Sequence, residues 1–231
     1  MTLDFEKIEA CVGVVFKDKD TLVQAFIHRS YLNEHPEVKL AHNERLEFLG
    51  DAVLELVITD HLYRSYPKKT EGELTSLRSA LVNTNSLSLV AQTLGLNEYL
   101  LLSKGEAKDT GRARQFILAN TFESVIGSIY LDQGYDAAQL FIAKNLIPKT
   151  EEILEGNLMH DPKSFFQEKA QEKAGVTPSY KVLSESGPDH AKTFTVGLYI
   201  GNELVVEAKG PSKQEAEQEA ARQGLVVKKW R

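Results

Sequence analysis

The sequence predicts two domains, an all-α helical domain followed by a smaller α+β domain whose elements run in the order α-β-β-β-α. Residues 4–155 carry apolar side chains at helical spacing between short polar connections, without convincing strand alternation. Beyond a polar stretch that begins near residue 156, short β-rich runs alternate with turn signals. We therefore place the domains at residues 1–155 and 161–231, with a linker at residues 156–160.

Helices are expected over most of the first domain. Apolar residues recur there every three to four positions, which is the period of an amphipathic α-helix. Glycines at positions 95, 105, 111 and 134 supply several of the breaks between helices. The expected segments are residues 4–11, 18–33, 41–66, 70–95, 97–102, 112–132 and 135–155.

The second domain is expected to begin and end with a helix. Asp161 can cap a helix that has Pro162 at its first position and runs to about Ala174. Three β-rich runs follow, SYKVLSES, AKTFTVGLYI and ELVVEAKG, and the turn-forming stretches SGPD and GN separate them. The last helix follows Ser212, and its expected inner face consists of Ala216, Ala220, Ala221 and Leu225.

The composition is that of an ordinary globular protein, with 231 residues of which 42% are hydrophobic. No apolar run approaches the roughly 20 residues that span a bilayer, and the N-terminus opens with acids where a signal peptide carries positive charge. We therefore expect a cytoplasmic protein without a membrane segment. The single cysteine, Cys11, has no partner for an internal disulfide and lies in an apolar stretch, so we expect a buried and inert thiol.

The charges are divided unevenly between the two domains. The net charge of −6 argues at first against a nucleic-acid partner, because neutralising phosphates requires Lys and Arg. However, residues 1–160 hold 16 Lys and Arg against 23 Asp and Glu, whereas residues 161–231 hold 11 against 10. An acid-rich domain beside a more basic one suits an enzyme that concentrates divalent cations in one domain and holds a polyanion with the other.

The stretch HNERLEFLGDAVLELV is expected to form a helix with one acidic face. At about 100° per residue, Glu44, Glu47 and Asp51 fall within an arc of about 60°. A solvated amphipathic face is the ordinary explanation of such a pattern. The expected opposite, apolar side consists of Leu46, Leu49, Val53, Leu56 and Val57.

Two features argue against a merely solvated face. Phe48 and Leu54 flank the acids, so the helix is apolar nearly all round except for its carboxylates. Gly50 offers a point where another backbone can approach closely. Glu55 extends the acidic face by one more turn, and we expect it to be solvated.

A second helix, FILANTFESVIGSIYLD, carries Asn120, Glu123 and Gly127 at a matching spacing. Between Phe116 and Tyr130, Glu123 is the only ionisable side chain. An unpaired carboxylate buried on an apolar helix would cost several kcal/mol, so Glu123 should have a partner. Two partners remain open: a structural Arg or Lys, or a cation that bridges the two helices.

If the two helices pack acid face to acid face, Glu47, Asp51, Asn120 and Glu123 form an oxygen-rich cage. Hard oxygen ligands without His or Cys suit Mg²⁺, or Mn²⁺ as a substitute, and exclude most other metals. A bound Mg²⁺ can generate hydroxide from water and stabilise a leaving oxygen, so no protein nucleophile is required for phosphodiester hydrolysis.

Four blocks, NERLEFLGDAVL, HRSY at residues 28–31, EGELTSLRSALV and ILANTFESVIGSIYLD, together resemble ribonuclease III. The resemblance covers essentially the whole chain in the expected order. It implies a homodimeric, Mg²⁺-dependent endonuclease that cuts double-stranded RNA, leaving 5′-phosphate and 3′-hydroxyl ends with a short 3′ overhang. It also implies a role in rRNA and other RNA processing, with ribosomal RNA precursors as substrates.

The resemblance also assigns roles to individual residues. Glu47, Asn120 and Glu123 would be the metal positions. Asp51 and Glu123 would be the catalytic residues, with Asp51 orienting the attacking water or a group next to the metal ligands. Accessory or substrate-facing positions would be Glu44, on the dimer and RNA-facing surface, and Glu71 and Arg78, near the substrate backbone.

Asn120 departs from the pattern of the family, which usually has Asp at this position. An amide oxygen can still bind Mg²⁺ but brings no charge, so the metal affinity or the preferred metal would change. Three explanations remain open: an active natural variant, a substitution that traps an inactive complex, and a non-catalytic double-stranded RNA-binding protein with a metal site impaired at Asn120.

The stretches DPKSFFQEKAQE, GPDHAKTF and GPSKQEAEQEAA resemble a double-stranded RNA-binding domain. Such a domain reads the shape of the A-form duplex across two minor grooves and the phosphates between them. The resemblance implies three contact regions: Gln167 and Glu168 on 2′-hydroxyls, His190 in a minor groove, and Ser212 and Lys213 on phosphate at a helix N-terminus. Gln214 stands where a second basic residue is usual, which would weaken binding.

Overall fold

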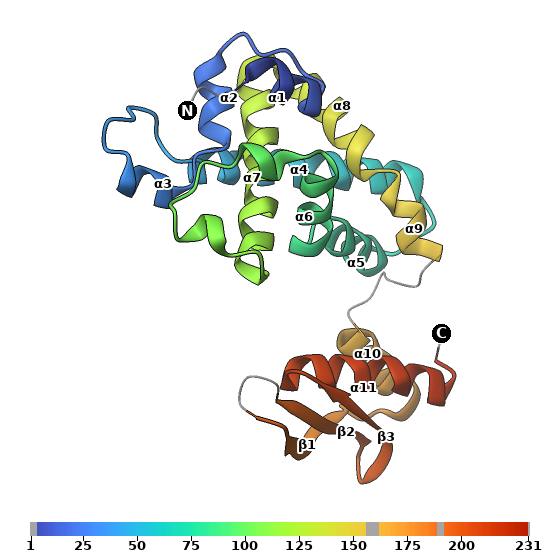
Figure 1. Cartoon of the computed structure of the whole chain (residues 1–231). Helices are drawn as coiled ribbons and strands as arrows, with labels where there is room; N and C mark the ends of the chain where they lie inside the picture. Colours follow the sequence, from blue (N-terminus) through green and yellow to red (C-terminus); the bar gives the residue numbers. More distant parts are fainter. Residues whose placement is uncertain (1–3, 156–161, 189–191, 231) are drawn as a thin grey trace. The chain divides into compact units, whose positions relative to one another are not determined.

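The computed structural model describes residues 4–155, 162–188 and 192–230. The chain divides into two compact units, Met1–Met159 and His160–Arg231, which are described separately (Figure 1). The linker predicted at residues 156–160 and the helix cap predicted at Asp161 lie outside the described residues. None of the helices in the described ranges combines the length and apolar character needed to cross a membrane.

The described part of the N-terminal unit is helical. The elements are α1 (Phe5–Val12), α2 (Lys19–Ala25), α3 (Arg29–Glu34), α4 (Glu44–Ser65), α5 (Glu71–Leu81), α6 (Thr84–Thr93), the 3-10 helices η1 (Leu96–Tyr99) and η2 (Glu106–Lys108), α7 (Arg112–Gln133), α8 (Tyr135–Leu146) and α9 (Lys149–Glu155).

Three helices that were expected to be continuous are each divided in two, so these predictions were wrong. Residues 18–33 are interrupted because Ile27 is extended and forms a parallel bridge with Leu101. Residues 70–95 are interrupted at Asn83, whose side chain accepts a hydrogen bond from Ser86 N (2.9 Å) and caps α6. Residues 135–155 are interrupted at Pro148, which has no N–H to donate.

The core of the N-terminal unit is built around α4 and α7, which cross each other (Figure 1). Helix α7 is buried along most of its length, and its hydroxyl groups bond to the helix's own backbone, as Thr121 does to Ile117 O (2.7 Å). A Cβ atom built on Gly50 would overlap the carbonyl oxygen of Glu123 and lie 2.8 Å from Gly127 N. The expectation of a close approach at Gly50 is confirmed.

The apolar face predicted for α4 is only partly correct. Leu46, Val53 and Val57 are buried, whereas Leu49 is half-buried and Leu56 is 57% exposed. Of the two residues expected to flank the acids, Leu54 is buried and Phe48 is 81% exposed. The reason is that α4 carries apolar side chains nearly all round, and neighbouring helices of the same chain cover only part of its circumference.

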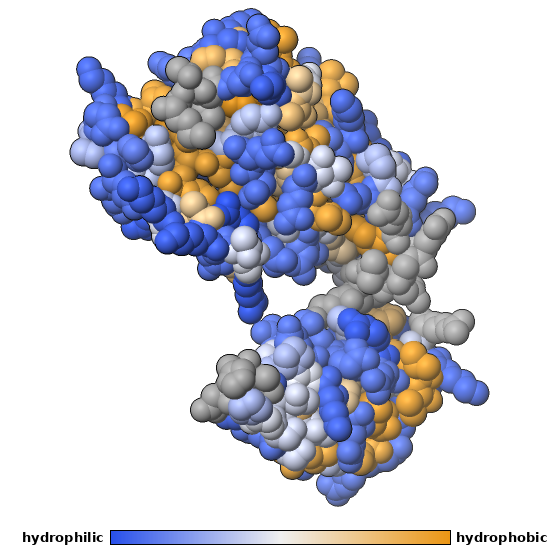
Figure 2. Space-filling model, viewed as in Figure 1, coloured by the Kyte–Doolittle hydropathy of each residue, from blue (hydrophilic) through white to orange (hydrophobic). Residues whose placement is uncertain are grey.

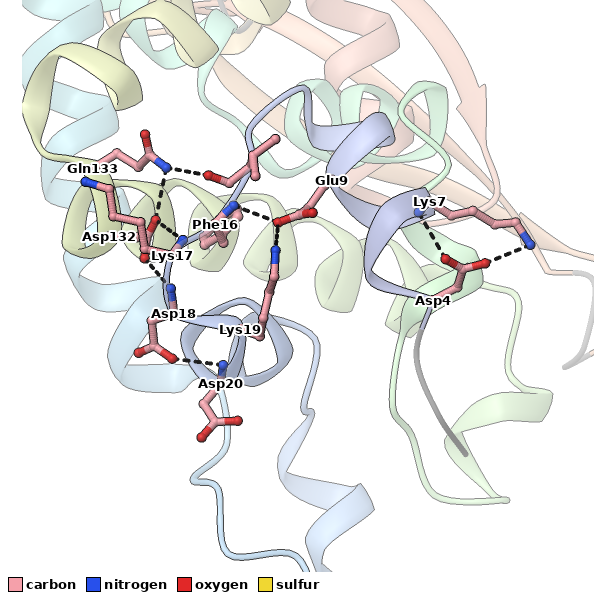
Figure 3. A network of polar contacts seen from close by, with 11 residues as sticks. Asp4, Lys7, Glu9, Phe16, Lys17, Asp18, Lys19, Asp20, Asp132 and Gln133 are labelled. Carbon is pink, nitrogen blue, oxygen red and sulfur yellow. Dashed lines mark hydrogen bonds and ion pairs between the residues drawn. The ribbon is translucent and has the colours of Figure 1, made fainter.

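Two acidic side chains, Asp132 and Glu9, bind backbone N–H groups of the segment between α1 and α2 (Figure 3). Asp132, near the end of α7, accepts hydrogen bonds from Lys17 N (3.0 Å) and Asp18 N (2.7 Å). Glu9 accepts from Phe16 N (2.6 Å) and pairs with Lys19, whose ammonium lowers the pKa of Glu9. Asp132 therefore holds the N-terminal segment against α7, and Glu9 stabilises the turn between α1 and α2. Cys11 is partly rather than fully buried, which corrects its predicted burial.

The C-terminal unit consists of α10 (Pro162–Ala174), β1 (Ser179–Ser186), β2 (Thr193–Ile200), β3 (Glu203–Gly210) and α11 (Lys213–Lys228), so the predicted element order is confirmed. The strands form an antiparallel sheet in the order β1-β2-β3, and both helices cover one face of it (Figure 1). The core contains Phe166, Ala170, Leu198, Ala208, Ala220 and Ala221. Trp230 packs on Phe166 with ring centroids 5.1 Å apart.

Candidate functional site

The crossing of α4 and α7 brings carboxylates from both helices together. Because neither glycine at the crossing has a side chain, the two backbones approach closely and the flanking residues face the same region. Glu47 and Asp51 come from α4, and Asn120 and Glu123 come from α7. Glu47 and Asp51 lie near enough to Glu123 for their charges to raise its pKa, and Asn120 lies beside Glu47, so the four residues lie in one region of the fold.

Glu123 is the most perturbed of these groups. Burial raises the pKa of Glu123 to about 8, and the charges of Asp51, Glu47 and Glu55 add to the increase. Within the described residues, Glu123 has no Lys, Arg or His within ion-pair distance and no side-chain hydrogen bond. The structural Arg or Lys partner considered from the sequence is therefore absent from the described chain.

Glu47 and Asn120 interact directly. Burial raises the pKa of Glu47, the charge of Glu44 raises it further, and a hydrogen bond from the Asn120 side chain opposes the increase. Because only the amide nitrogen can donate to a carboxylate, the oxygen of Asn120 remains available as an acceptor. An Asp at this position would instead place one more negative charge beside Glu47 and Glu123.

The side chains do not form a closed ligand set by themselves. Across the described ranges, no three His, Cys, Asp or Glu side chains lie close enough together to hold a metal ion. The oxygens that α4 and α7 contribute are three carboxylates and one amide, and carboxylates without a counter-charge repel one another. A bound cation would remove that repulsion.

Glu55 lies in an ion pair rather than in solvent, which corrects its predicted solvation. Arg78 Nε lies 2.9 Å from Glu55 Oε2, and Arg78 Nη1 donates to Thr59 Oγ1 (3.0 Å). Together with Glu44, Glu47 and Asp51, Glu55 completes a line of four carboxylates along α4, which we call the acid stripe. Arg78 therefore lies at the Glu55 end of this stripe.

The other two predicted accessory residues lie apart from the crossing. Glu71 is exposed at the first position of α5 and accepts a hydrogen bond from Thr75 Oγ1 (3.1 Å). Glu44, at the first position of α4, lies 3.7 Å from Arg29 Nη1 and 3.8 Å from His42 Nδ1. Spacing along the sequence gave no signal that Arg29 would meet Glu44, because the two residues belong to different helices.

The predicted RNA contacts of the C-terminal unit lie on its surface as far as they are described. Gln167 and Glu168 are exposed on α10, and His190 lies outside the described residues. The hydroxyl of Ser212 caps α11 by accepting from Glu215 N (3.2 Å). Lys213 Nζ lies 3.4 Å from Glu185 Oε1 and 5.5 Å from the centre of the Phe194 ring.

Comparison with known proteins identifies both units. Residues 18–150 match the family model described as Ribonuclease-III-like, and residues 162–226 match the one described as Double-stranded RNA binding motif. A protein named Ribonuclease 3 from Protochlamydia amoebophila is 49% identical over 218 residues, which cover 94% of this chain and 89% of the relative. The chain belongs to the ribonuclease III family.

Similarity to two further proteins supports this assignment. A Ribonuclease 3 from Streptococcus gordonii is 45% identical over 91% of this chain and 90% of its own length. The nuclease domain of ribonuclease III from Campylobacter jejuni superposes on 62% of this chain and 99% of its own with a TM-score of 0.56 and 38% identity. These names support the nuclease interpretation and do not support the non-catalytic alternative.

The acid stripe of this ribonuclease III family member lies in the unit that matches the Ribonuclease-III-like model. The other unit has the double-stranded RNA-binding fold. One residue beside the stripe and one member of it were missed or misjudged from the sequence. Arg29 was not considered as a site residue, and Glu55 was expected to be solvated. The HRSY block contained Arg29, but only the tertiary structure places its side chain beside α4.

Proposed function

We propose that this member of the ribonuclease III family is a Mg²⁺-dependent endonuclease specific for double-stranded RNA. It leaves 5′-phosphate and 3′-hydroxyl ends with a short 3′ overhang. The observation that carries the proposal is the half-buried Glu123, whose pKa is raised by burial and by neighbouring carboxylates and beside which the described residues place no cationic side chain. A bound cation would stabilise a carboxylate in this position. The double-stranded RNA-binding fold of the same chain would supply the phosphodiester substrate by binding an RNA duplex.

The donor set fits Mg²⁺, with Mn²⁺ as a substitute. Glu47, Glu123 and the amide oxygen of Asn120 would hold the ion, because hard oxygens are the ligands that both metals prefer. When bound, the metal lowers the pKa of water and polarises the phosphoryl group. Asp51 is exposed beside these residues and would orient the attacking water.

The C-terminal unit would hold the duplex. Gln167 and Glu168 on α10 would meet 2′-hydroxyls, and Lys213 at the start of α11 would bind phosphate. Lys213 lies on the surface, where its ammonium forms an exposed ion pair with Glu185 and lies over the Phe194 ring, so it can exchange Glu185 for an RNA phosphate at little cost. His190 would enter a minor groove. Ribosomal RNA precursors in the cytoplasm are the substrates that family membership suggests.

A homodimer would cover an apolar surface of the N-terminal unit. Phe48, Leu56 and Tyr63 are 81%, 57% and 73% exposed and lie on one side of α4. Figure 2 shows hydrophobic residues at the surface of this unit among hydrophilic ones. The nuclease domain from Campylobacter jejuni is described as flexible in a region involved in dimer formation. An exposed stripe of this kind is typical of a protein interface.

The proposal is tested by incubating the chain and its Asn120→Asp variant with a long RNA duplex in Mg²⁺, Mn²⁺ or chelator and sizing the products. Short fragments from the unaltered chain, lost in chelator, are expected. Cleavage by the Asp variant alone would mean that the site is assembled but disabled at Asn120. If neither chain cut the duplex, the proposed activity would be wrong.

A further inference from the structure

Arg29 is held beside the start of α4 by backbone hydrogen bonds. His28 N donates to Leu101 O (3.0 Å), and Asn43 N donates to Ile27 O (2.9 Å), so the segment before Arg29 is fixed on both sides. His28 Nδ1 also caps α3 by accepting from Ser30 N (3.3 Å). Arg29 is therefore anchored at its backbone while its side chain extends over the surface.

Among the residues that the structure describes, Glu44 alone pairs with the Arg29 guanidinium, so most of its N–H donors are free. Its Nη1 lies 3.7 Å from Glu44 Oε1, and 72% of the side chain is exposed. By contrast, Arg114 donates three hydrogen bonds, to Asp109 O (3.1 Å), Asn97 Oδ1 (3.2 Å) and Glu106 O (2.8 Å). Since a guanidinium has five N–H donors, Arg29 can bind a further anion without giving up a structural role.

An arginine lies at each end of the acid stripe. Arg29 lies beside Glu44, and Arg78 lies beside Glu55. Glu55 follows Glu44 by eleven positions, which is about 16 Å along a helix axis. A row of carboxylates repels RNA phosphates, so a strand that approaches the stripe needs positive charge at its borders.

We propose that Arg29 binds a backbone phosphate of the RNA at the Glu44 end of the acid stripe and that Glu44 positions its guanidinium. This inference rests on the proposed function, because it assumes that the stripe receives the strand to be cut. Planar guanidinium groups pair with two phosphate oxygens at once, whereas the pair with Glu44 is long and exposed. The phosphate either takes the place of Glu44 as the partner of the Arg29 guanidinium or binds the guanidinium together with Glu44.

The charged groups around Arg29 are compatible with this role. His42 lies on the other side of Glu44, and the charges of Arg29 and His42 both lower the pKa of His28, after burial as the main cause. The charges of Glu44 and Glu106 act in the opposite direction on His28. Glu44 thus lies between the Arg29 guanidinium and the His42 imidazole.

The test measures the binding of a fluorescent RNA duplex to the full chain in Mg²⁺ over a range of KCl concentrations. A Glu123→Gln background keeps the duplex uncut. Arg29→Gln should weaken binding about tenfold and reduce the slope of log Kd against log salt by about one. Arg29→Lys should restore the slope because it keeps the charge.

Arg64→Gln is the matched control, because Arg64 is 75% exposed on the same helix as Glu44 and, in the described part of the chain, pairs with Asp60 alone. It should bind like the background. Equal slopes for Arg29→Gln and Arg64→Gln would overturn the role of Arg29. Parallel gels with the unaltered chain distinguish the two proposals: binding without cleavage contradicts the proposed function but leaves the slope comparison intact, and absence of duplex binding contradicts both.

Discussion

Gly50 of α4 and Gly127 of α7 face each other at the crossing of the two helices, and neither position has room for a methyl group. A Cβ on Gly50 would overlap the carbonyl of Glu123, and a Cβ on Gly127 would overlap the carbonyl of Leu46 and lie 3.1 Å from Gly50 N. The same contact that closes the core therefore sets the distance between Glu47 and Glu123. Packing and the site's geometry depend on one pair of residues.

Gly50→Ala should separate the helices and cost about 1–3 kcal/mol of unfolding free energy, which is the usual cost of overpacking a core. Cleavage should fall as well, because the carboxylates move apart. Urea unfolding monitored by circular dichroism measures the first effect. Gly72→Ala is the control, because no atom lies within 4 Å of its added Cβ and Ala is the better helix former. Equal stability of both variants would contradict the tight crossing.

Glu123→Ala should reduce cleavage about a hundredfold or more and leave duplex binding nearly intact. The carboxylate is proposed to hold the metal, whereas the duplex is proposed to be held mainly by the C-terminal unit. Cleavage is measured by product sizing and binding by fluorescence anisotropy. Unchanged cleavage by Glu123→Ala would be incompatible with the proposed metal site.

In chelator, the stability of the chain should fall as the pH rises from about 4.5 to about 8. The folded chain holds the Glu123 proton with a pKa of about 8 against 4.5 for the ordinary group, so the folded state binds more protons in this window. The unfolded state is then favoured as the proton is lost. Glu123→Gln should remove this part of the pH dependence, a few kcal/mol at most, in urea unfolding at several pH values. Parallel profiles for both chains would show that the pKa of Glu123 is not raised in the folded chain.

Asn120→Asp should make the metal-free chain less stable and the metal-bound chain more stable. The additional carboxylate lies beside Glu47 and repels it without a cation, but attracts the ion when one is present. Thermal melting with and without Mn²⁺ measures both effects, and the metal-induced rise in Tm should be larger for the Asp variant. Isothermal titration with Mn²⁺ checks the affinity directly. An equal rise in Tm would indicate that residue 120 does not contact the metal.

Lys213→Ala should weaken duplex binding about tenfold and lower its salt dependence by about one charge. Cleavage at saturating RNA should change little, because Lys213 lies in the unit without the acid stripe. Lys209→Ala serves as the control, since Lys209 is an exposed lysine of β3 that is not part of the predicted contact regions. If both variants bound alike, the phosphate role of Lys213 would be refuted.

The sequence by itself determined that a helical part precedes an α-β-β-β-α part, that Glu44, Glu47 and Asp51 share one face of α4, and that Asn120 and Glu123 share one face of α7. These properties follow from periodicity, because residues three, four and seven positions apart share one side of a helix whatever surrounds it. Gly50 could be singled out for the same reason, since a glycine among large side chains marks a close approach. The resemblance to ribonuclease III then assigned roles to residues that the pattern had already placed on one face.

Only the tertiary structure decided which neighbours each face meets. The bridge between Ile27 and Leu101 breaks a helix that its own periodicity would continue. Leu56 is exposed although its spacing is that of a core residue, and Glu55 meets Arg78 from another helix. Arg29 lies beside Glu44 because backbone hydrogen bonds to Leu101 and Asn43 fix the segment that precedes it. Contacts between segments far apart in the chain depend on how the helices pack, and local periodicity carries no information about that packing.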